Sequence, residues 1–471
     1  TDPFIIVARD PYGVRPLYQL SCNNNLPQGF IPEKTSRIIN ENIIGFASEM
    51  KVLSTALNRQ NVFYNKTSSK TLISNIRNKT KNAQYDSLSK LDITVFQPGS
   101  YSILTHSYRS HAEWEFSVKN KMYTSFGFGS TNLMVKLIDS SKGILMENLY
   151  EQIRYYFSRA VEKRVSNTDR PVACLLSGGL DSSLVTALAA KISKYPLETY
   201  SIGLAGSQDL ANAQIVADFL KTRHTSVVIS AEEFLNAIPK VIRDIESYDT
   251  TTVRASVGNY LIGKFISKNS QAKVILNGDG SDELMGGYLY FHAAPSSLEF
   301  DAECRRLLKD IHAFDVLRSD KCISSHGLEP RTPFLDREWV QFYLSIQPAI
   351  RTHNIEKCTE KYLIRKAFDK EKILPEEVLW RRKEAFSDGV SSQTKSWYEV
   401  IQEHVEILKR NKSPFLEKKT YEYLPPKTDE QLYYRNIYEH FFPNQSKLVP
   451  YFWMPKFVEA KDSSARTLDL Y

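Results

Sequence analysis

The feature that most constrains the fold is an alternation of strand-like and helix-like segments that begins near Met146. Alternation of this kind is typical of a parallel sheet with helices on both faces, in which ligands bind at the carboxyl ends of the strands. We therefore predict a doubly wound parallel-sheet domain over residues 146–471, whose helical C-terminal region, from about Leu307, covers those strand ends. The strand-like runs are residues 171–177, 199–204, 227–230 and 272–280.

The N-terminal part has a different pattern. Short β-type runs separated by turn residues extend over residues 4–104, which predicts a β-rich domain over residues 1–125 and an α/β chain that is α+β overall. Residues 58–90 are polar and have little to bury, so we expect a surface insertion there. Residues 126–145 are weakly patterned and are expected to form the linker. The chain opens on an apolar run without an initiator Met, as a fragment of a longer protein would.

Composition excludes several classes of partner. The 61 basic and 54 acidic residues leave a net charge of only +7, with no dense basic stripe, so we expect no nucleic-acid partner. No apolar run approaches the roughly 18 residues of a membrane span, so we expect no membrane association. The five cysteines are scattered without CxxC spacing and indicate neither a zinc site nor a disulfide framework. A reducing, cytoplasmic location fits this pattern.

The sharpest motif is SGGLDSS at residues 177–183, between an apolar strand and a helical segment. A strand, a glycine turn and a helix start place backbone N–H groups and a positive helix end around one point, as a bound pyrophosphate requires. The glycines would let the backbone approach the anion, and the serines would donate hydroxyl groups. Asp181 would act through Mg²⁺, because a carboxylate and a phosphate repel each other. The candidate nucleotide ligands are Ser177, Gly178, Gly179, Asp181, Ser182 and Ser183.

This loop lacks the lysine and the GKS/T ending of a Walker A loop. It resembles instead the loop of the ATP pyrophosphatases, which cleave ATP between the α and β phosphates. The plain alternative is a tight βα turn with incidental serines. The strand before the loop, the aspartate within it and the helix after it favour nucleotide binding.

The other motifs resemble one family within that superfamily, the glutamine-hydrolysing asparagine synthetases, and occur in the same order. The resemblance implies an ATP-pyrophosphatase domain preceded by part of an antiparallel, β-rich class II glutaminase domain. The segments that resemble the synthetase part are residues 199–220, 248–256, 276–288, 328–336, 379–389, 432–443 and 448–457. Residues 7–18 and 46–53 resemble the second half of the glutaminase domain.

The resemblance implies ATP-dependent amidation of L-aspartate to L-asparagine through β-aspartyl-AMP, with release of AMP and pyrophosphate. It also implies small-molecule substrates, namely L-aspartate, ATP and ammonia or glutamine, and a possible homodimer. The family's glutaminase half begins with a nucleophilic cysteine, and its glutamine-binding positions lie upstream of the ARDPYG segment at residues 8–13. Those positions are absent here, so we expect this chain to use ammonia and a full-length parent to use glutamine.

Residue roles follow from the same resemblance. Asp181 and Asp282 are implied to share Mg²⁺ on the leaving pyrophosphate, and Lys383 is the cation assigned to the same pyrophosphate. Arg254, with Thr251 beside it, is a candidate for binding the substrate carboxylate or the phosphates. The residues implied to line the nucleotide are Leu175, Ile202, Asn277 and Gly278.

Asp279 departs from the family pattern. Family members typically have Glu within SGEGSDE, where it is thought to assist formation or ammonolysis of the acyl-adenylate, whereas this chain reads NGDGSDE. The negative charge is kept, but the reach falls by about 1.5 Å, one bond length. Because a misplacement of ~1 Å can cost roughly a hundredfold in rate, we expect a slower enzyme unless the loop compensates.

Two other functions stay open at this point. One is another adenylating amidotransferase that resembles the β-lactam synthetases. The other is a degenerate, non-catalytic homologue that only binds nucleotide. Taken alone, Asp282 and Glu283 would be ordinary helix-capping acids, and Lys383 would belong to a solvated basic face. The ordered motifs favour the functional interpretation of each.

Overall fold

The computed structural model describes residues 3–22, 45–57, 91–107, 113–124, 143–194, 196–353, 359–381, 396–460 and 462–463. The chain divides into two compact units, Thr1–Thr124 and Ser125–Tyr471, and each is described by itself. The predicted insertion at residues 58–90 lies outside the described residues, and the predicted linker at residues 126–145 lies almost wholly outside them. Within the described ranges, no helix is both long enough and apolar enough to cross a membrane.

The first unit contains two three-stranded antiparallel sheets, with the orders β1-β5-β6 and β3-β2-β4. Arg9 connects them: its buried guanidinium donates to the carbonyl oxygens of Gly13 at 3.0 Å, Arg15 at 2.9 Å and Phe96 at 2.8 Å. The turn after β1 is thereby tied to the end of β4. The strands are β1 (Phe4–Ala8), β2 (Tyr18–Cys22), β3 (Gly45–Ala47), β4 (Leu91–Val95), β5 (Ser100–Ser107) and β6 (Glu113–Met122), and a helix spans residues 50–57.

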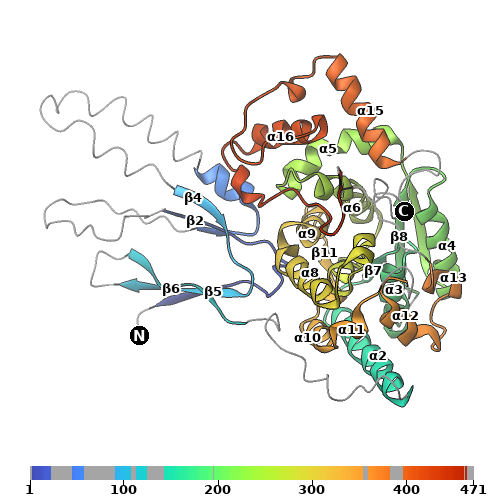
Figure 1. Ribbon diagram of the computed structural model, residues 1–471. Coiled ribbons are helices and arrows are strands. Elements are labelled where there is room, and N and C mark those ends of the chain that lie inside the picture. The colour runs from blue at the N-terminus through green and yellow to red at the C-terminus, as the bar shows by residue number, and fades with distance from the viewer. Residues whose placement is uncertain are drawn as a thin grey trace, which may run out of the picture. The chain divides into compact units, whose positions relative to one another are not determined.

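The second unit is built on a five-stranded parallel sheet with the order β11-β10-β7-β8-β9. From β7 the chain runs outward through β8 and β9, then returns to β10 and β11 on the other side. The helices that follow β7 and β8 lie on one face of the sheet and those that follow β9 and β10 lie on the other (Figure 1), as right-handed crossovers require for this strand order. The predicted doubly wound parallel sheet is thus confirmed. Its strands are β7 (Val172–Leu175), β8 (Glu198–Gly203), β9 (Arg223–Val228), β10 (Val274–Leu276) and β11 (Glu329–Arg331).

Several helices of this unit begin where a side chain can satisfy the first N–H groups. Ser230 and Glu233 form a capping box at the start of α5, and Asp249 caps α6 by accepting a hydrogen bond from Thr252 N. The helices are α2 (Gly143–Ser166), α3 (Leu180–Ile192), α4 (Gln208–Leu220), α5 (Ala231–Ile245), α6 (Thr250–Asn269), α7 (Ser281–Met285), α8 (Ser297–Asp310), α9 (Asp315–Ser324), α10 (Arg337–Ser345), α11 (Pro348–Arg351), α12 (Tyr362–Asp369), α13 (Glu376–Leu379), α15 (Trp397–Arg410) and α16 (Asp429–Phe441). Short 3-10 helices are η2 (Leu289–Ala293), η3 (Ile311–Ala313), η4 (Pro333–Leu335), η5 (Pro414–Leu416) and η6 (Ser446–Leu448).

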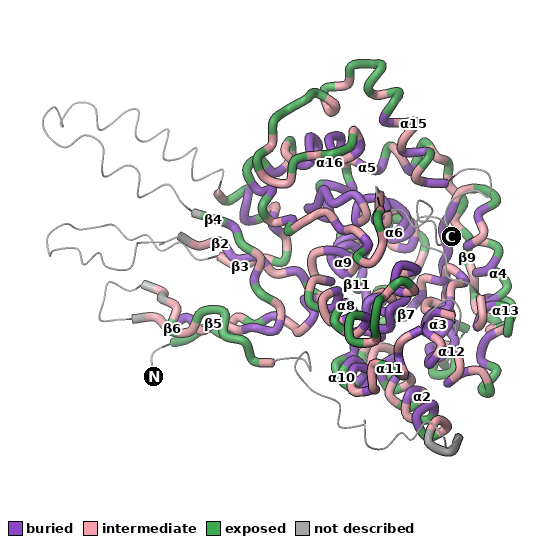
Figure 2. Tube along the Cα trace, in the orientation of Figure 1, coloured by how far each residue is buried: buried purple, intermediate pink, exposed green. Residues whose placement is uncertain are grey.

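A shared apolar core fixes the sheet against α6, and α6, β8 and β10 are largely buried (Figure 2). Ala173 and Ile275 of the sheet and Ile262 of α6 belong to this core, where burying one aliphatic side chain contributes about 1.5–3 kcal/mol. The packing holds β7 and β10 side by side with Leu276 opposite Cys174. The loops that leave these two strands therefore start at the same edge of the sheet.

Candidate active site

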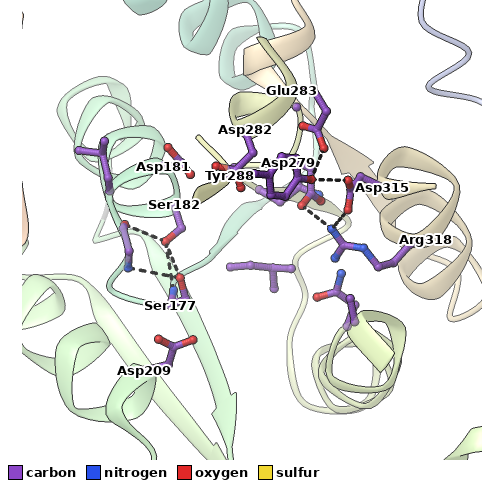
Figure 3. A pocket seen from close by; sticks show the side chains of 18 of the residues that line it. Ser177, Asp181, Ser182, Asp209, Asp279, Asp282, Glu283, Tyr288, Asp315 and Arg318 are labelled. Carbon is purple, nitrogen blue, oxygen red and sulfur yellow. Dashed lines mark hydrogen bonds and ion pairs between the residues drawn. The ribbon is translucent and has the colours of Figure 1, made fainter. Parts of the chain in front are cut away.

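A pocket lies at the carboxyl ends of β7, β8 and β10, where the alternating pattern predicts a ligand. Two loops contribute to its lining: the phosphate loop, residues 177–183 after β7, and the acidic loop, residues 277–283 after β10. Lys361 and Trp453, from the last third of the chain, also line it. In Figure 3 the labelled side chains of the phosphate loop lie on one side of the pocket and those around Asp279 lie on the other.

The shape of the phosphate loop depends on its glycine residues and on the serine hydroxyl groups. Gly178 has a φ of +72°, and a Cβ there would come within 2.4 Å of Asn212, so glycine is required. Ser182 Oγ accepts a hydrogen bond from Ser177 N at 3.2 Å and donates to Gly179 O at 3.3 Å. Gly179 caps α3, and no side chain among the described residues bonds to this cap. The first N–H groups of α3 therefore remain for an anionic ligand.

The two loops touch each other. A Cβ on Gly278 would lie 2.9 Å from Asp181 Cβ and 2.9 Å from Ser182 N, so glycine allows the acidic loop to pack on the phosphate loop. Across the same contact, Ser281 Oγ donates a hydrogen bond to Asp181 Oδ1 at 2.6 Å. Packing of the loops thus determines where the Asp181 carboxylate points.

A buried lysine lies between two carboxylates at this junction. Lys361 Nζ is 2.5 Å from Asp181 Oδ2 and 2.5 Å from Asp282 Oδ1, and its side chain is 1% exposed. The two aspartates come from different loops, yet their oxygens converge on a single positive charge. They are therefore close enough to share one cation.

The other side of the pocket is a chain of charged groups. Arg318 Nη2 donates to Asp279 Oδ1 at 3.2 Å and to Asp315 Oδ1 at 2.6 Å. The Tyr288 hydroxyl lies 2.8 Å from Asp315 Oδ2 and 2.5 Å from Glu283 Oε1. A phenol has one proton, so it can donate to only one of these carboxyl groups at a time. The other contact requires a proton on that carboxyl group.

Burial and charge decide where that proton resides. Burial, followed by the negative charge of Asp315, raises the pKa of Glu283 well above its usual value. Burial alone would also raise the pKa of Asp315, but the charge of Arg318 and the hydrogen bonds from Glu283, Arg318 and Tyr288 together outweigh burial, and the pKa is lowered. Burial raises the pKa of Asp279 as well, although Arg318 partly offsets the effect. The proton thus resides on Glu283, and Asp315 is ionised.

The remaining wall suits a nucleoside. Its apolar part contains Leu175, Tyr200, Ile202, Ala255 and Ile262. Thr251 Oγ1 and Asn277 Nδ2 are buried at this pocket and have no hydrogen-bond partner among the described residues. Buried polar atoms usually have partners, and a bound ligand would provide them here.

Most residues predicted from the sequence come together at this pocket. Gly178 and Ser183 do not appear among the described residues that line it: Gly178 packs against Asn212, and Ser183 is 0% exposed. Lys383 lies outside the described residues. The predicted residues that line the pocket are Leu175, Ser177, Gly179, Asp181, Ser182, Ile202, Thr251, Asn277, Gly278, Asp279 and Asp282.

Arg254 is also missing from the described lining. Its side chain is 5% exposed and is paired with Glu430, Nη2 to Oε2 at 2.6 Å, and with Asp462, Nη1 to Oδ1 at 2.6 Å. Burial alone would lower its pKa, but the two carboxylates hold that pKa well above its usual value. In this arrangement Arg254 fixes the C-terminal segment, and contact with a substrate would require Asp462 to leave.

The sequence analysis did not single out several charged residues at the pocket, among them Asp315, Arg318 and Lys361. Arg318 and Asp315 lie at the start of α9, and Lys361 immediately precedes α12. The i, i+3 spacing of Asp315 and Arg318 is a local signal, but it is equally typical of an exposed helical ion pair. Lys361 has no local signal, because its partners lie 180 and 79 positions earlier in the chain.

Comparisons with known proteins agree with this geometry. The family model described as asparagine synthase matches residues 152–303 and 294–454. The glutamine-hydrolyzing asparagine synthetase of Gallus gallus is 38% identical over 474 residues, covering 99% of this chain and 75% of that protein. The proteins of the same description from Mesocricetus auratus and Homo sapiens are each 45% identical over 334 residues, covering 70% of this chain and 59% of their own length.

Among solved structures, the NMN synthetase of Francisella tularensis covers 63% of this chain and 96% of its own chain, at 13% identity and a TM-score of 0.30. That likeness is too distant to bear on the site.

Proposed function

Because this chain belongs to the asparagine synthase family, we propose that it catalyses ATP-dependent amidation of L-aspartate to L-asparagine. The reaction proceeds through β-aspartyl-AMP and releases AMP and pyrophosphate. The nitrogen comes from free ammonia, or from glutamine in the full-length protein. The observation that carries the proposal is the convergence of Asp181 and Asp282, from two loops at adjacent strand ends, on one positive charge.

The first step is adenylation. A β-carboxylate oxygen of aspartate attacks the α-phosphorus of ATP, and the bond from that phosphorus to the β-phosphate oxygen breaks. Attack of one anion on another requires charge neutralisation and in-line positioning. The N–H groups at the start of α3 and the hydroxyls of Ser177 and Ser182 are placed to hold the triphosphate.

Asp181 and Asp282 would hold Mg²⁺ on the pyrophosphate. Magnesium in proteins is usually bound by one or two carboxylates together with substrate phosphates. No group of three or more His, Cys, Asp or Glu side chains suited to a metal occurs in the described part of the chain, so the nucleotide would have to complete the site. When bound, Mg²⁺ neutralises the charge that develops on the leaving pyrophosphate.

The second step is ammonolysis. The ammonia nitrogen attacks the β-carbonyl carbon of the intermediate, AMP leaves, and one proton must pass from the nitrogen to a base. Asp279 is the proposed base, because burial raises the pKa of its carboxyl toward the range useful for proton transfer. Thr251 would position the substrate through its buried hydroxyl. The roles of Arg254 at the substrate and Lys383 at the pyrophosphate stay predictions.

The test is a coupled product assay on the purified chain with ATP, Mg²⁺, ammonium and L-aspartate labelled with ¹⁸O in its β-carboxylate. We expect asparagine, AMP and pyrophosphate in equal amounts, with one ¹⁸O atom transferred to AMP. A parallel reaction with glutamine tests the nitrogen source. Absence of asparagine despite pyrophosphate release would favour an amidotransferase that uses a different amine. ATP binding without any turnover would favour a degenerate homologue.

A homodimer and a cytoplasmic location stay predictions. Sedimentation analysis tests the first and cell fractionation tests the second. The scattered cysteine pattern supports the second.

A further inference from the structure

Asn259 is a polar residue within the apolar wall of the pocket. It lies on α6, is 6% exposed and lines the pocket. Ala255, four positions before it, and Ile262, three positions after it, lie on the same face of the helix and also line the pocket. Ile262 shares an apolar core with Tyr200 and Ile202. The amide of Asn259 therefore interrupts the part of the wall that suits a nucleoside.

This amide has no hydrogen-bond partner among the described residues. Asn436, on α16, shows how a buried asparagine is satisfied by the protein alone. It is 4% exposed, and its Nδ2 donates to the carbonyl oxygens of Phe415 at 2.9 Å and Glu417 at 3.0 Å. Its Oδ1 accepts a hydrogen bond from the Tyr421 hydroxyl. Asn259 is buried to a similar degree and lacks such partners.

Stability does not explain an asparagine at this position. Asparagine forms helices less readily than leucine or methionine. Burial of an amide without a partner also destabilises the folded chain. An apolar side chain would therefore suit both the helix and the wall better. A polar side chain that lowers stability beside a pocket is expected where a bound ligand supplies the missing partner.

The amide has the hydrogen-bonding groups that one edge of adenine requires. An asparagine side chain presents N–H donors and a carbonyl acceptor next to each other. Adenine presents the matching pair, the N7 acceptor and the donor amino group at position 6, whereas guanine has acceptors at both places. Pyrimidine bases have no N7. An amide in the nucleoside part of the pocket can thus distinguish adenine from the other bases.

We propose that Asn259 is a specificity-determining residue that selects adenine. Its amide donates a hydrogen bond to N7 and accepts one from the 6-amino group of ATP. The residue binds the base and takes no part in making or breaking bonds. The inference rests on the proposed function, because that function makes ATP the nucleotide.

The first test compares ATP with 7-deaza-ATP, which has a C–H group in place of N7. Both nucleotides are titrated calorimetrically into the wild type, Asn259→Leu and the control Asn269→Leu, which removes an exposed amide from the end of α6. One lost hydrogen bond should make the wild type bind 7-deaza-ATP roughly 3- to 10-fold more weakly than ATP. N259L should bind ATP roughly 10- to 100-fold more weakly than the wild type does, with the two nucleotides within about twofold of each other. N269L should behave like the wild type.

The second test measures thermal melts without nucleotide. N259L removes an unpaired buried amide, so its melting temperature should equal or exceed that of the wild type. A clear decrease would show that the amide stabilises the fold, and would overturn the inference. Asn259→Ala is the second variant if N259L does not fold, and it should lose the same preference for ATP over 7-deaza-ATP. A wild type without that preference, or a preference that persists in the Asn259 variants, would also overturn the inference.

These measurements separate the inference from the proposed function, since nucleotide binding requires neither L-aspartate nor ammonia. Asparagine synthesis by a wild type whose preference for ATP persists in N259L would leave the proposed function standing and remove the inference. Loss of the preference in N259L, in a chain that forms no asparagine, would remove the proposed amidation and leave the assignment of Asn259.

Discussion

The two sides of the pocket are built in different ways (Figure 3). The phosphate loop is one continuous turn between β7 and α3, and it offers backbone N–H groups and short hydroxyl side chains. The opposite side is assembled from the acidic loop, from Tyr288 just beyond α7 and from α9. Its charges are already paired, as Arg318 lies between Asp279 and Asp315.

This difference separates binding from chemistry. The phosphate loop leaves the start of α3 without a side-chain cap, and under the proposed function the ATP phosphates would fill that place. On the opposite side, Arg318 is already paired with Asp279 and Asp315 when no substrate is bound. Such pairing keeps the acids and bases of a site in defined protonation states. Substitutions on the two sides should therefore change different observables.

The largest effect is expected for Asp181→Ala in the phosphate loop. The change removes one of the two carboxylates that converge on a cation, so pyrophosphate release should fall on the order of 10³-fold at any ammonia concentration. Pyrophosphate release assayed with saturating ATP and L-aspartate checks it. The control is Asp169→Ala, an exposed aspartate that precedes β7. Comparable activity in both variants would remove Asp181 from the reaction.

A smaller effect is expected on the opposite side at Asp279. Asp279→Asn keeps the shape but removes the proposed base, so kcat for ammonia-dependent asparagine formation should fall about 10²-fold. Asp279→Glu should preserve or raise kcat, because it restores the longer reach of the family residue. Steady-state kinetics with varied ammonia measure both variants. Loss of activity in D279E would show that the acidic loop has been assigned wrongly.

The same contrast explains how much of the molecule could be predicted from its sequence. β7, the phosphate loop and α3 are contiguous, so their strand, glycine and helix signals appear within residues 171–192. The parallel sheet was predictable for the same reason, since each strand and its following helix carry their own periodicity. The class of fold and the location of the pocket follow from these local patterns.

The pairing of charges on the opposite side could not be predicted, because the partners are distant in sequence. Asp279 and Arg318 are 39 positions apart, and nothing local shows that α9 packs beside the acidic loop. Arg254 is a second example of distant pairing: this cation in a predicted functional motif is paired with Glu430 and Asp462, which follow it by 176 and 208 positions. Tertiary packing, and not residue type, decides whether such a charge is free for a ligand.

A pH-dependent effect on stability is expected for Glu283→Gln. The pKa of Glu283 in the folded chain is raised by burial above its value of 4.5 in the unfolded chain. The folded state therefore holds the proton more tightly, and the resulting stability is present below pH 4.5 and lost as pH rises through the folded-state pKa. Glutamine cannot ionise, so E283Q should become more stable relative to the wild type as pH rises.

Thermal melts of both proteins between about pH 5 and pH 9 measure this difference. Ionisation of the buried Glu283 destabilises the wild type as pH rises, and E283Q avoids this cost. We expect the melting temperature of E283Q to rise relative to that of the wild type by roughly 2–4 °C for each kcal/mol of this ionisation cost. Glu151→Gln, at an exposed position of α2, is the control and should show a flat difference. A flat difference for E283Q as well would mean that Glu283 is ionised at all these pH values.

The smallest effect is expected at Ser183, which the sequence motif predicts to be a nucleotide ligand but which does not line the pocket among the described residues. Ser182 lines the pocket, but Ser183, one position along α3, is turned into the interior, where its hydroxyl has no hydrogen-bond partner among the described residues. Because α3 is buried on nearly all sides, its sequence has no polar face that would distinguish the two serines. Ser183→Ala should leave the ATP dissociation constant within about twofold and leave stability unchanged or raised by up to about 1 kcal/mol, since it removes an unpaired buried hydroxyl.

Ser182→Ala is the matched comparison, because the same hydroxyl is lost one residue away. It should weaken ATP binding roughly tenfold, as expected for a donor that contacts a charged phosphate. Calorimetric titration with ATP and thermal melts of both variants make the measurement. If S183A weakened ATP binding as strongly as S182A, the start of α3 would have to turn when nucleotide binds, and the phosphate loop would not be prearranged for ATP.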